Sequence, residues 1–442
     1  MQPGEEGGEH GCTEQALPPA TGRRDEGALS RLTLPFRAIV SMASLGAWTF
    51  RAIVSMASLK KQEQDQQPMA SLPGDVIFEI LSRVPYKSLY RFKCVSKPWL
   101  ALCSDPKIQS ISPKALTGFF YSDENDGKTL LKKDNPGALH FHSLSRGGPP
   151  PAYPCLPFLR GSYKRFMIAQ CCSSLLLCRC SKSYKQQRRG QYEYIVCNPL
   201  TEQWTVLPPI ELPEGMTSHL LDLNQADRFL GTVDQSSFVV FATMIDLLER
   251  VTQVAIYSSG TGQWTFMRSG WGPETVFAVG VAHVFLNGIM HFTTIHPSVV
   301  TVDMDGRVWR EIQVPHGFDV ADPYASGFIG NSRGRLHSWR IDYDYQLSVS
   351  VLEDYEDGGK WTLKHTVNVL GLFGRHHQEA DDSYEMFAIH PECNLIFLTD
   401  WKGMIVSYDM DSQEVCVICA SGDFFCGLPY SPCSAKWSSD GH

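Results

Sequence analysis

A strand, a polar turn and then a tryptophan recur along most of this 442-residue chain, and this repeat constrains the fold more than any other feature. In each copy a short apolar run is followed by Gly, Asn, Asp or Ser, and an aromatic or apolar residue comes next. The last residue of the run and the residue in the tryptophan position lie seven apart in four copies. The five pairs are Cys197 with Trp204, Tyr257 with Trp264, Val302 with Trp309, Leu352 with Trp361, and Tyr408 with Val415.

Successive tryptophan positions are about 53 residues apart on average, which is typical of one four-stranded blade per repeat in a β-propeller. Residues 115–437 therefore predict an all-β domain of about six blades. A strong hairpin signal lies within it, because Asn287-Gly288 separates two apolar runs and both residues tolerate positive φ. The alternative is an irregular β-sandwich in which the tryptophan spacing arises by chance.

A different pattern precedes the β region, at residues 69–110. Apolar residues from Val76 to Val84 recur at spacings of three and four, which predicts one amphipathic helix with Asp75 near its start. Pro85 ends it. A second short helix carries Leu89, and Ser96 is the expected cap of a third, whose apolar face includes Trp99. Residues 1–67, rich in Gly, Glu and Pro at first, are expected to form a disordered leader.

The helical region closely resembles the F-box in the form common among plant F-box proteins. The resemblance covers a Leu-Pro start at Leu72 and Pro73, a Glu-Ile-Leu-Ser-Arg-Val-Pro core ending at Pro85, and an Arg-Phe-Lys-Cys-Val-Ser-Lys-Pro-Trp end at Trp99. It implies docking onto a Skp1-like adaptor, which links the chain to a cullin and a RING protein. The residues expected to bind the adaptor are Leu72, Pro73, Ile80, Leu81, Leu89, Val95 and Trp99.

The β region resembles the F-box-associated domains of the same proteins. The stretch from Cys197 to Trp204 and the ending from Leu428 to Cys433 carry this resemblance. It implies that the β domain captures a protein substrate, although the sequence does not identify the substrate or the residues that bind it.

The sequence therefore predicts a non-catalytic adaptor, the substrate-recognition subunit of a Skp1–cullin–F-box ubiquitin ligase. One alternative is an F-box scaffold acting outside the ligase, and another is a β-propeller enzyme, which needs titratable groups converging at the central channel. A helical unit of about 40 residues rarely buries enough apolar surface to be stable alone, which favours a partner. A plain three-helix domain without a partner is the remaining alternative.

Composition excludes several other classes of function. The net charge is −8 and no clustered basic surface is evident, so we expect neither nucleic-acid nor membrane binding. The 14 cysteines are scattered, and those between Cys171 and Cys180 punctuate an apolar strand, so we expect reduced core cysteines and no metal or other cofactor. We expect the protein in the cytoplasm, the nucleus or both.

Overall fold

The computed structural model describes two regions of the chain, each with gaps. In the helical region it describes Ile77, Ile80, Leu81, Phe92 and residues 95–103. In the β region it describes residues 116–122, 139–144, 156–183, 185, 192–211, 226–234, 236–278, 283–296, 298–315, 328–355, 359–377, 383–422 and 424–433. The predicted leader, residues 1–67, lies outside these ranges.

The helical region contains the helix α5, Lys97–Cys103. Ser96 caps it as expected, because its carbonyl accepts from the Leu100 amide at 2.8 Å and its Oγ lies 3.4 Å from the Trp99 amide nitrogen. Pro98 occupies the first turn, where a missing N–H costs nothing. Ile77, Ile80, Leu81 and Phe92 are also helical, in agreement with the predicted helices.

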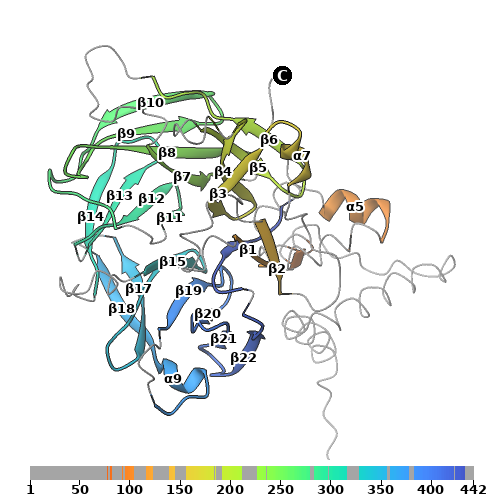
Figure 1. The fold of residues 1–442 in the computed structure, drawn as a ribbon, viewed down its shortest axis with the longest axis vertical. Coiled ribbons are helices and arrows are strands. Elements are labelled where there is room, and N and C mark those ends of the chain that lie inside the picture. Colours follow the sequence, from red (N-terminus) through yellow and green to blue (C-terminus); the bar gives the residue numbers. More distant parts are fainter. Residues whose placement is uncertain are drawn as a thin grey trace, which may run out of the picture. The chain divides into compact units, whose positions relative to one another are not determined.

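The β region is a six-bladed propeller, as the repeat predicted, with six antiparallel sheets that follow one another in chain order (Figure 1). Blade one contains β1 (Gly118–Ser122), β2 (Leu139–Ser143) and β23 (Leu428–Tyr430). Blade two contains β3 (Arg165–Cys172), β4 (Leu175–Ser181), β5 (Glu193–Asn198) and β6 (Gln203–Val206). Blade three contains β7 (Asp227–Thr232), β8 (Phe238–Ile245), β9 (Val251–Ser258) and β10 (Gln263–Arg268).

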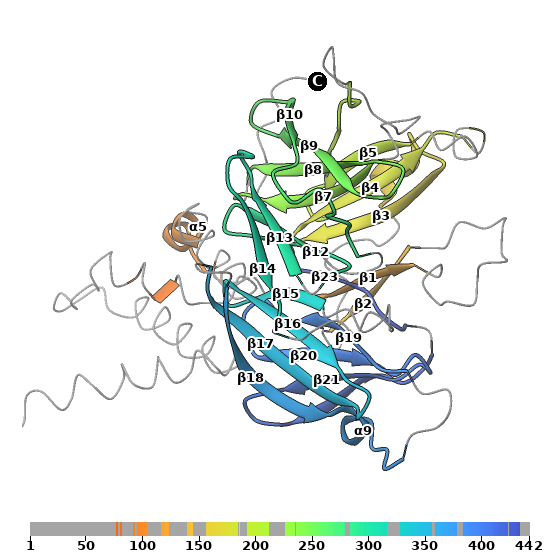
Figure 2. The ribbon, with the colours of Figure 1, turned by 90° about the vertical axis from the view of Figure 1, so that its left-hand side faces the viewer.

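The remaining blades have the same order. Blade four contains β11 (Val284–Leu286), β12 (Ile289–Thr293), β13 (Ser298–Asp303) and β14 (Trp309–Gln313). Blade five contains β15 (Phe328–Ser332), β16 (Arg335–Ile341), β17 (Gln346–Asp354) and β18 (Lys360–Asn368), which lie side by side in Figure 2. Blade six contains β19 (Glu385–Ile389), β20 (Leu395–Thr399), β21 (Ile405–Asp409) and β22 (Val415–Cys419). Two short helices, α7 (Pro157–Arg160) and α9 (Val369–Leu372), lie in connections.

The strand–turn–tryptophan repeat is the hairpin between the last two strands of blades two to six. The two residues of each pair face each other across this hairpin, for example Cys197 opposite Trp204 and Tyr408 opposite Val415. The Leu352 to Trp361 copy is longer because the ladder between β17 and β18 contains a register shift after Leu352. The Asn287-Gly288 turn joins β11 to β12 with φ values of 52° and 80°, as its sequence predicted.

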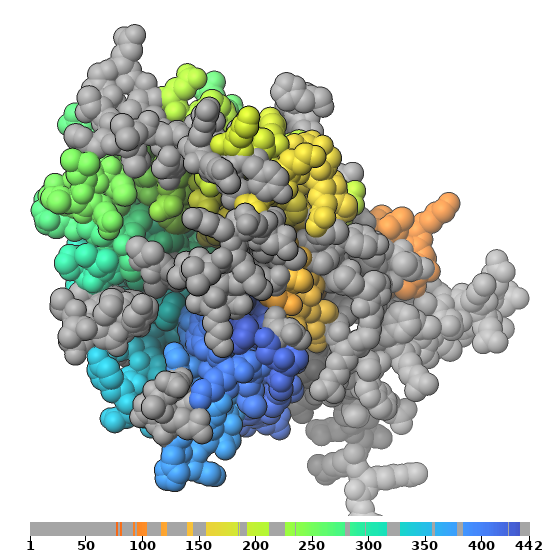
Figure 3. All heavy atoms as spheres, viewed as in Figure 1, coloured from red at the N-terminus to blue at the C-terminus, as the bar shows by residue number. Residues whose placement is uncertain are grey.

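The ring closes through strands from opposite ends of the sequence. β23 pairs with β1, so that Gly118 lies opposite Tyr430 and Phe120 opposite Leu428. An apolar cluster fills each interface between neighbouring blades, and the interface of blades six and one is packed by Phe119, Phe397 and Phe424. In the space-filling view the sequence colours succeed one another around the ring (Figure 3).

The innermost strands β3, β7, β11, β15, β19 and β23 surround a central channel. They run in the same direction, as shown where Ser332 at the end of β15 donates to the His390 carbonyl just after β19 at 2.8 Å. We call the end at which these strands begin the N-terminal end of the channel. The hairpins β4–β5, β8–β9, β12–β13, β16–β17 and β20–β21 lie at that end, because strands alternate in direction within each blade.

Candidate functional site

The helical region places its apolar residues at different depths. Leu81 and Phe92 are each 2% exposed, and the Phe92 and Trp99 rings meet edge to face at 5.7 Å. Trp99 itself is half-buried, whereas Leu100, its neighbour on α5, is 48% exposed. This unit therefore has apolar surface beyond what its own contacts cover.

The residues predicted to bind an adaptor are only partly described. Ile80, Val95 and Trp99 are half-buried, so part of each side chain is accessible. Leu81 is buried, and Leu72, Pro73 and Leu89 lie outside the described residues. Contact of these seven side chains with an adaptor stays a prediction.

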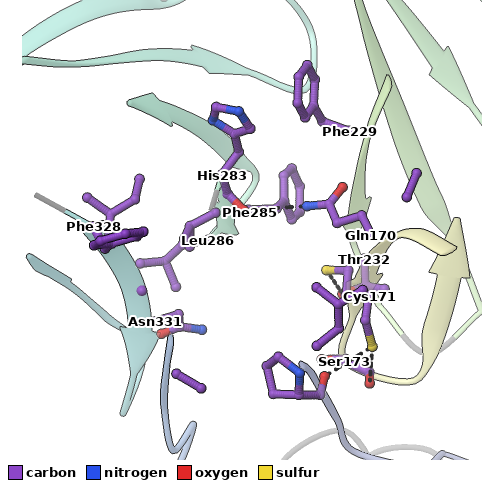
Figure 4. A pocket seen from close by; sticks show the side chains of 18 of the residues that line it. Gln170, Cys171, Ser173, Phe229, Thr232, His283, Phe285, Leu286, Phe328 and Asn331 are labelled. Carbon is purple, nitrogen blue, oxygen red and sulfur yellow. Dashed lines mark hydrogen bonds between the residues drawn. The ribbon is translucent and has the colours of Figure 1, made fainter. Parts of the chain in front are cut away.

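The channel of the propeller forms a cavity of about 1190 Å³. Each of the six innermost strands contributes to its lining, together with Cys426 and Gly427 just before β23. In Figure 4 the side chains of Gln170 and Cys171 face the space from one side and those of Phe328 and Asn331 from another, with Phe285 between them. Gly231 makes room for the Phe285 ring, because a Cβ at Gly231 would lie 2.5 Å from it.

A polar bridge joins three blades at the channel wall. The Gln170 amide group donates to the His283 carbonyl at 3.4 Å, and its oxygen accepts from the Leu230 amide at 2.5 Å. The His283 imidazole packs edge-on against Phe229 at 4.6 Å, and burial lowers its pKa to about 4. Its Nδ1 is buried and has no hydrogen-bond partner in the described parts of the chain.

Two carboxylates stand at the first positions of inner strands, Asp227 in β7 and Glu385 in β19. Burial raises the pKa of both. For Asp227 the charges of Arg179 and Arg228 oppose this effect, and the Arg228 guanidinium also stacks on Tyr194 at 3.8 Å. For Glu385 the opposing interaction is a hydrogen bond from the Trp401 side chain, and no cation contributes.

Several cysteines are core residues as the sequence predicted, whereas Cys171 and Cys172 are half-buried and Cys416 is exposed. Cys178 and Cys197 are buried with their sulfurs 3.9 Å apart, and all described cysteines are free thiols. Burial raises the pKa of Cys171, and that of Cys426 to about 12, so these channel thiols stay protonated and are weak nucleophiles. The described residues hold no group of three side chains suited to a metal ion, and none of their helices has the length and apolar character needed to cross a membrane.

Sequence reasoning did not find the channel residues. The repeat marks the third and fourth strands of each blade, whereas His283, Glu385 and Gln170 belong to first strands or to their flanks. These residues could have been found only from their place on the first strand of each blade. The repeat does not show where that strand begins or ends.

Comparison with known proteins agrees with both parts of this architecture. An F-box domain model matches residues 69–110, and a model of the beta-propeller of F-box protein At3g26010-like proteins matches residues 134–426.

Three curated proteins of Arabidopsis thaliana are similar over most of their length. The putative F-box protein At3g52320 is 30% identical over 70% of this chain and 76% of its own length. F-box protein At5g07610 is 25% identical over 67% of this chain and 70% of its own. The putative F-box/kelch-repeat protein At1g15680 is 24% identical over 78% of this chain and 82% of its own. With a helical F-box region followed by a closed six-bladed ring, the chain belongs to the F-box proteins with a C-terminal At3g26010-like β-propeller.

Proposed function

We propose that this protein is the substrate receptor of a Skp1–cullin–F-box ubiquitin ligase. In this role the F-box docks onto a Skp1-like adaptor, and the propeller captures the protein to be ubiquitylated. The observation that carries the proposal is the F-box match at residues 69–110 in a chain whose following residues build a closed propeller.

The exposure of the helical unit supports a docking role. Leu100 is 48% exposed, and Ile80, Val95 and Trp99 keep part of their surface accessible. Covering such residues with a partner groove gains about 25 cal/mol for each Å² of apolar surface removed from water. Leu72, Pro73 and Leu89 complete the proposed contact set, and Leu81, which is 2% exposed, would support it from inside the unit.

The channel supports binding in preference to catalysis. A catalytic site needs a nucleophile or base held in a hydrogen bond to a second titratable group. No hydrogen bond between described residues joins His283, Asp227 and Glu385 to one another, and the channel thiols are protonated. The receptor would contribute proximity, because it holds the acceptor lysine of its substrate near an enzyme carried by the RING protein. Such a receptor would act in the cytoplasm, the nucleus or both.

Copurification tests the docking. Full-length chain and a Skp1-like adaptor are coexpressed, and we expect a stable complex that the double substitution Leu72→Ala with Pro73→Ala abolishes, because it removes predicted apolar contacts. The matched control is Leu247→Ala with Leu248→Ala, which truncates two apolar residues that are 83% and 65% exposed on the β8–β9 hairpin. This control should bind the adaptor like the unaltered chain.

A folded chain that captures no Skp1-like adaptor would refute the receptor proposal. An equal loss of binding in the control variant would show that the effect of the Leu72 and Pro73 substitutions is not specific to the F-box. Ubiquitylation of a captured partner by the reconstituted ligase separates a receptor from a scaffold acting outside the ligase, since only the receptor supports it.

A further inference from the structure

Four of the most exposed large apolar side chains of the propeller lie on hairpin tips at the N-terminal end of the channel. Among the described residues of the propeller, six such side chains are at least half exposed. Two lie on outermost strands, Leu363 on β18 and Val417 on β22. The other four occupy hairpin tips at the N-terminal end, namely Leu247, Leu248, Ile295 and Tyr343, which are 83%, 65%, 51% and 65% exposed. Exposed apolar groups concentrated on one face mark an interaction surface.

The backbone holds neighbouring tips in place. The connection between β10 and β11 passes between the β8–β9 and β12–β13 hairpins and bonds to both of them. The Val251 amide donates to the Thr275 carbonyl at 2.8 Å, and the Ile295 amide donates to the Val276 carbonyl at 3.0 Å. The leucine pair and Ile295 are thus displayed by a rigid frame, which lowers the entropic cost of binding.

Trp401 extends this surface to blade six. It occupies the tip of the β20–β21 hairpin with φ of 52°, a conformation that a bulky side chain rarely adopts. Its indole ring stacks on Phe425 at 6.3 Å and donates a hydrogen bond to Glu385. The strained tip therefore fixes an aromatic face directly beside a carboxylate that lines the channel.

Carboxylates and cations both stand at this end, and the two carboxylates that begin inner strands differ, because Arg179 and Arg228 act on Asp227 whereas none of the described cations acts on Glu385. Glu249, Asp342 and Asp344 are exposed on the same hairpins. Arg250, Arg375 and Lys182 carry positive charge there, but each is bound to a carboxylate of its own chain, Asp246 at 2.7 Å, Asp400 at 2.6 Å and Glu193 at 2.6 Å respectively. Further cations are exposed at this end, including Lys402 beside Trp401, Lys185 on the β4–β5 hairpin and Arg268 at the end of β10. Glu385 is partly desolvated and no cation among the described residues opposes the effect of burial on its pKa, so a bound cation would regain free energy that burial has cost it.

We propose that the N-terminal end of the channel captures an extended segment of the substrate protein in which a lysine or arginine stands between apolar side chains. The cation binds Glu385, and the apolar neighbours pack on Trp401, Tyr343, Ile295 and the Leu247–Leu248 pair. This inference rests on the proposed receptor function and specifies its substrate class.

The test uses the full-length chain and needs no adaptor, so it is independent of the docking experiment. Phage-displayed random dodecapeptides are selected on the immobilised protein, and the enriched peptides are synthesised with a fluorophore for anisotropy titration. We expect enrichment of Lys or Arg flanked by Leu, Ile, Val or aromatic residues. Glu385→Gln should weaken binding of these peptides about tenfold, because it removes one charge-assisted hydrogen bond while its amide oxygen can still accept from Trp401.

Two further variants localise the effect. Glu392→Gln neutralises a carboxylate that lines the same cavity just beyond the end of β19, at the opposite end of the channel, and should leave affinity unchanged. Leu247→Ala with Leu248→Ala should weaken binding several-fold while leaving adaptor copurification intact. Thermal unfolding of each variant confirms that it is folded.

Three results would overturn the proposal. They are a selection that enriches no peptide, a selection that enriches acidic or phosphate-mimicking peptides, and basic–apolar peptides that bind Glu385→Gln as tightly as the unaltered chain. If no such peptide binds but the adaptor does, this inference is wrong and the receptor proposal is unaffected. If the peptides bind but the adaptor does not, the receptor proposal is wrong and the peptide site is unaffected.

Discussion

His291 illustrates how the propeller buries a titratable side chain in its neutral form. The residue is fully buried, with Nδ1 3.0 Å from the Val284 carbonyl and Nε2 3.2 Å from the Tyr355 hydroxyl. The carbonyl can only accept, so Nδ1 carries the proton and Nε2 accepts from the tyrosine. Burial lowers the pKa of His291 to about 4, although the backbone contacts oppose this shift.

This histidine should make stability depend on pH. Its folded-state pKa lies below the unfolded value of 6.5, so the unfolded chain binds more protons between those values. The contribution to stability is fully present above pH 6.5, falls as pH is lowered, and is lost near pH 4, amounting to at most about 3 kcal/mol. We expect His291→Gln to flatten the curve of unfolding free energy against pH between 6.5 and 4. An unchanged curve in chemical denaturation would contradict a neutral buried imidazole.

Hydrogen bonds from tryptophan side chains join strands of neighbouring blades. Trp339 on β16 donates to the Met386 carbonyl on β19 at 2.8 Å, and Trp361 on β18 donates to the Gln313 carbonyl at the end of β14 at 2.8 Å. Trp339 is 3% exposed, whereas Trp361 is half-buried. The same bond therefore spans two blade interfaces at different depths.

This difference in depth predicts different costs for the same substitution. Trp339→Phe should cost about 3 kcal/mol, because it leaves a buried carbonyl unpaired and a small void. Trp361→Phe should cost about 1 kcal/mol, since water can replace the lost donor. Urea denaturation of the two variants compares them directly, and equal losses would show that depth does not set the cost.

Sequence could anticipate some elements and not others. The spacing of Tyr257 and Trp264 was readable because a hairpin fixes which residues lie opposite each other, and those two do. The hairpin at Asn287 was readable because positive φ restricts residue choice. The contact between Glu385 and Trp401 at the channel mouth could not be predicted. Glu385 begins β19 and Trp401 lies between β20 and β21, so the two residues come together only when the strands of blade six pair.

Ring closure governs the stability of the propeller as a whole. β23 supplies the innermost strand of blade one, and Tyr430 is fully buried there against Phe120 at 5.0 Å. We expect truncation before Leu428 to unfold the propeller or lower its melting temperature strongly, because it exposes both flanking blades and unpairs β1. Truncation after Cys433 is the control and should preserve the melting temperature measured by calorimetry. Equal melting temperatures for the two truncations would refute closure by β23.

The pairing of β1 with β23 also has a consequence for synthesis on the ribosome. More than 300 residues separate Phe119 from its partner Pro429, so the first strands of the ring leave the exit tunnel long before the last one is translated. The F-box helices emerge earlier still. A nascent chain therefore presents its F-box while the ring is open, and at 5–20 residues per second this interval lasts about 15 to 60 seconds. During that time the edge of β1 is a site for chaperones or for mispairing.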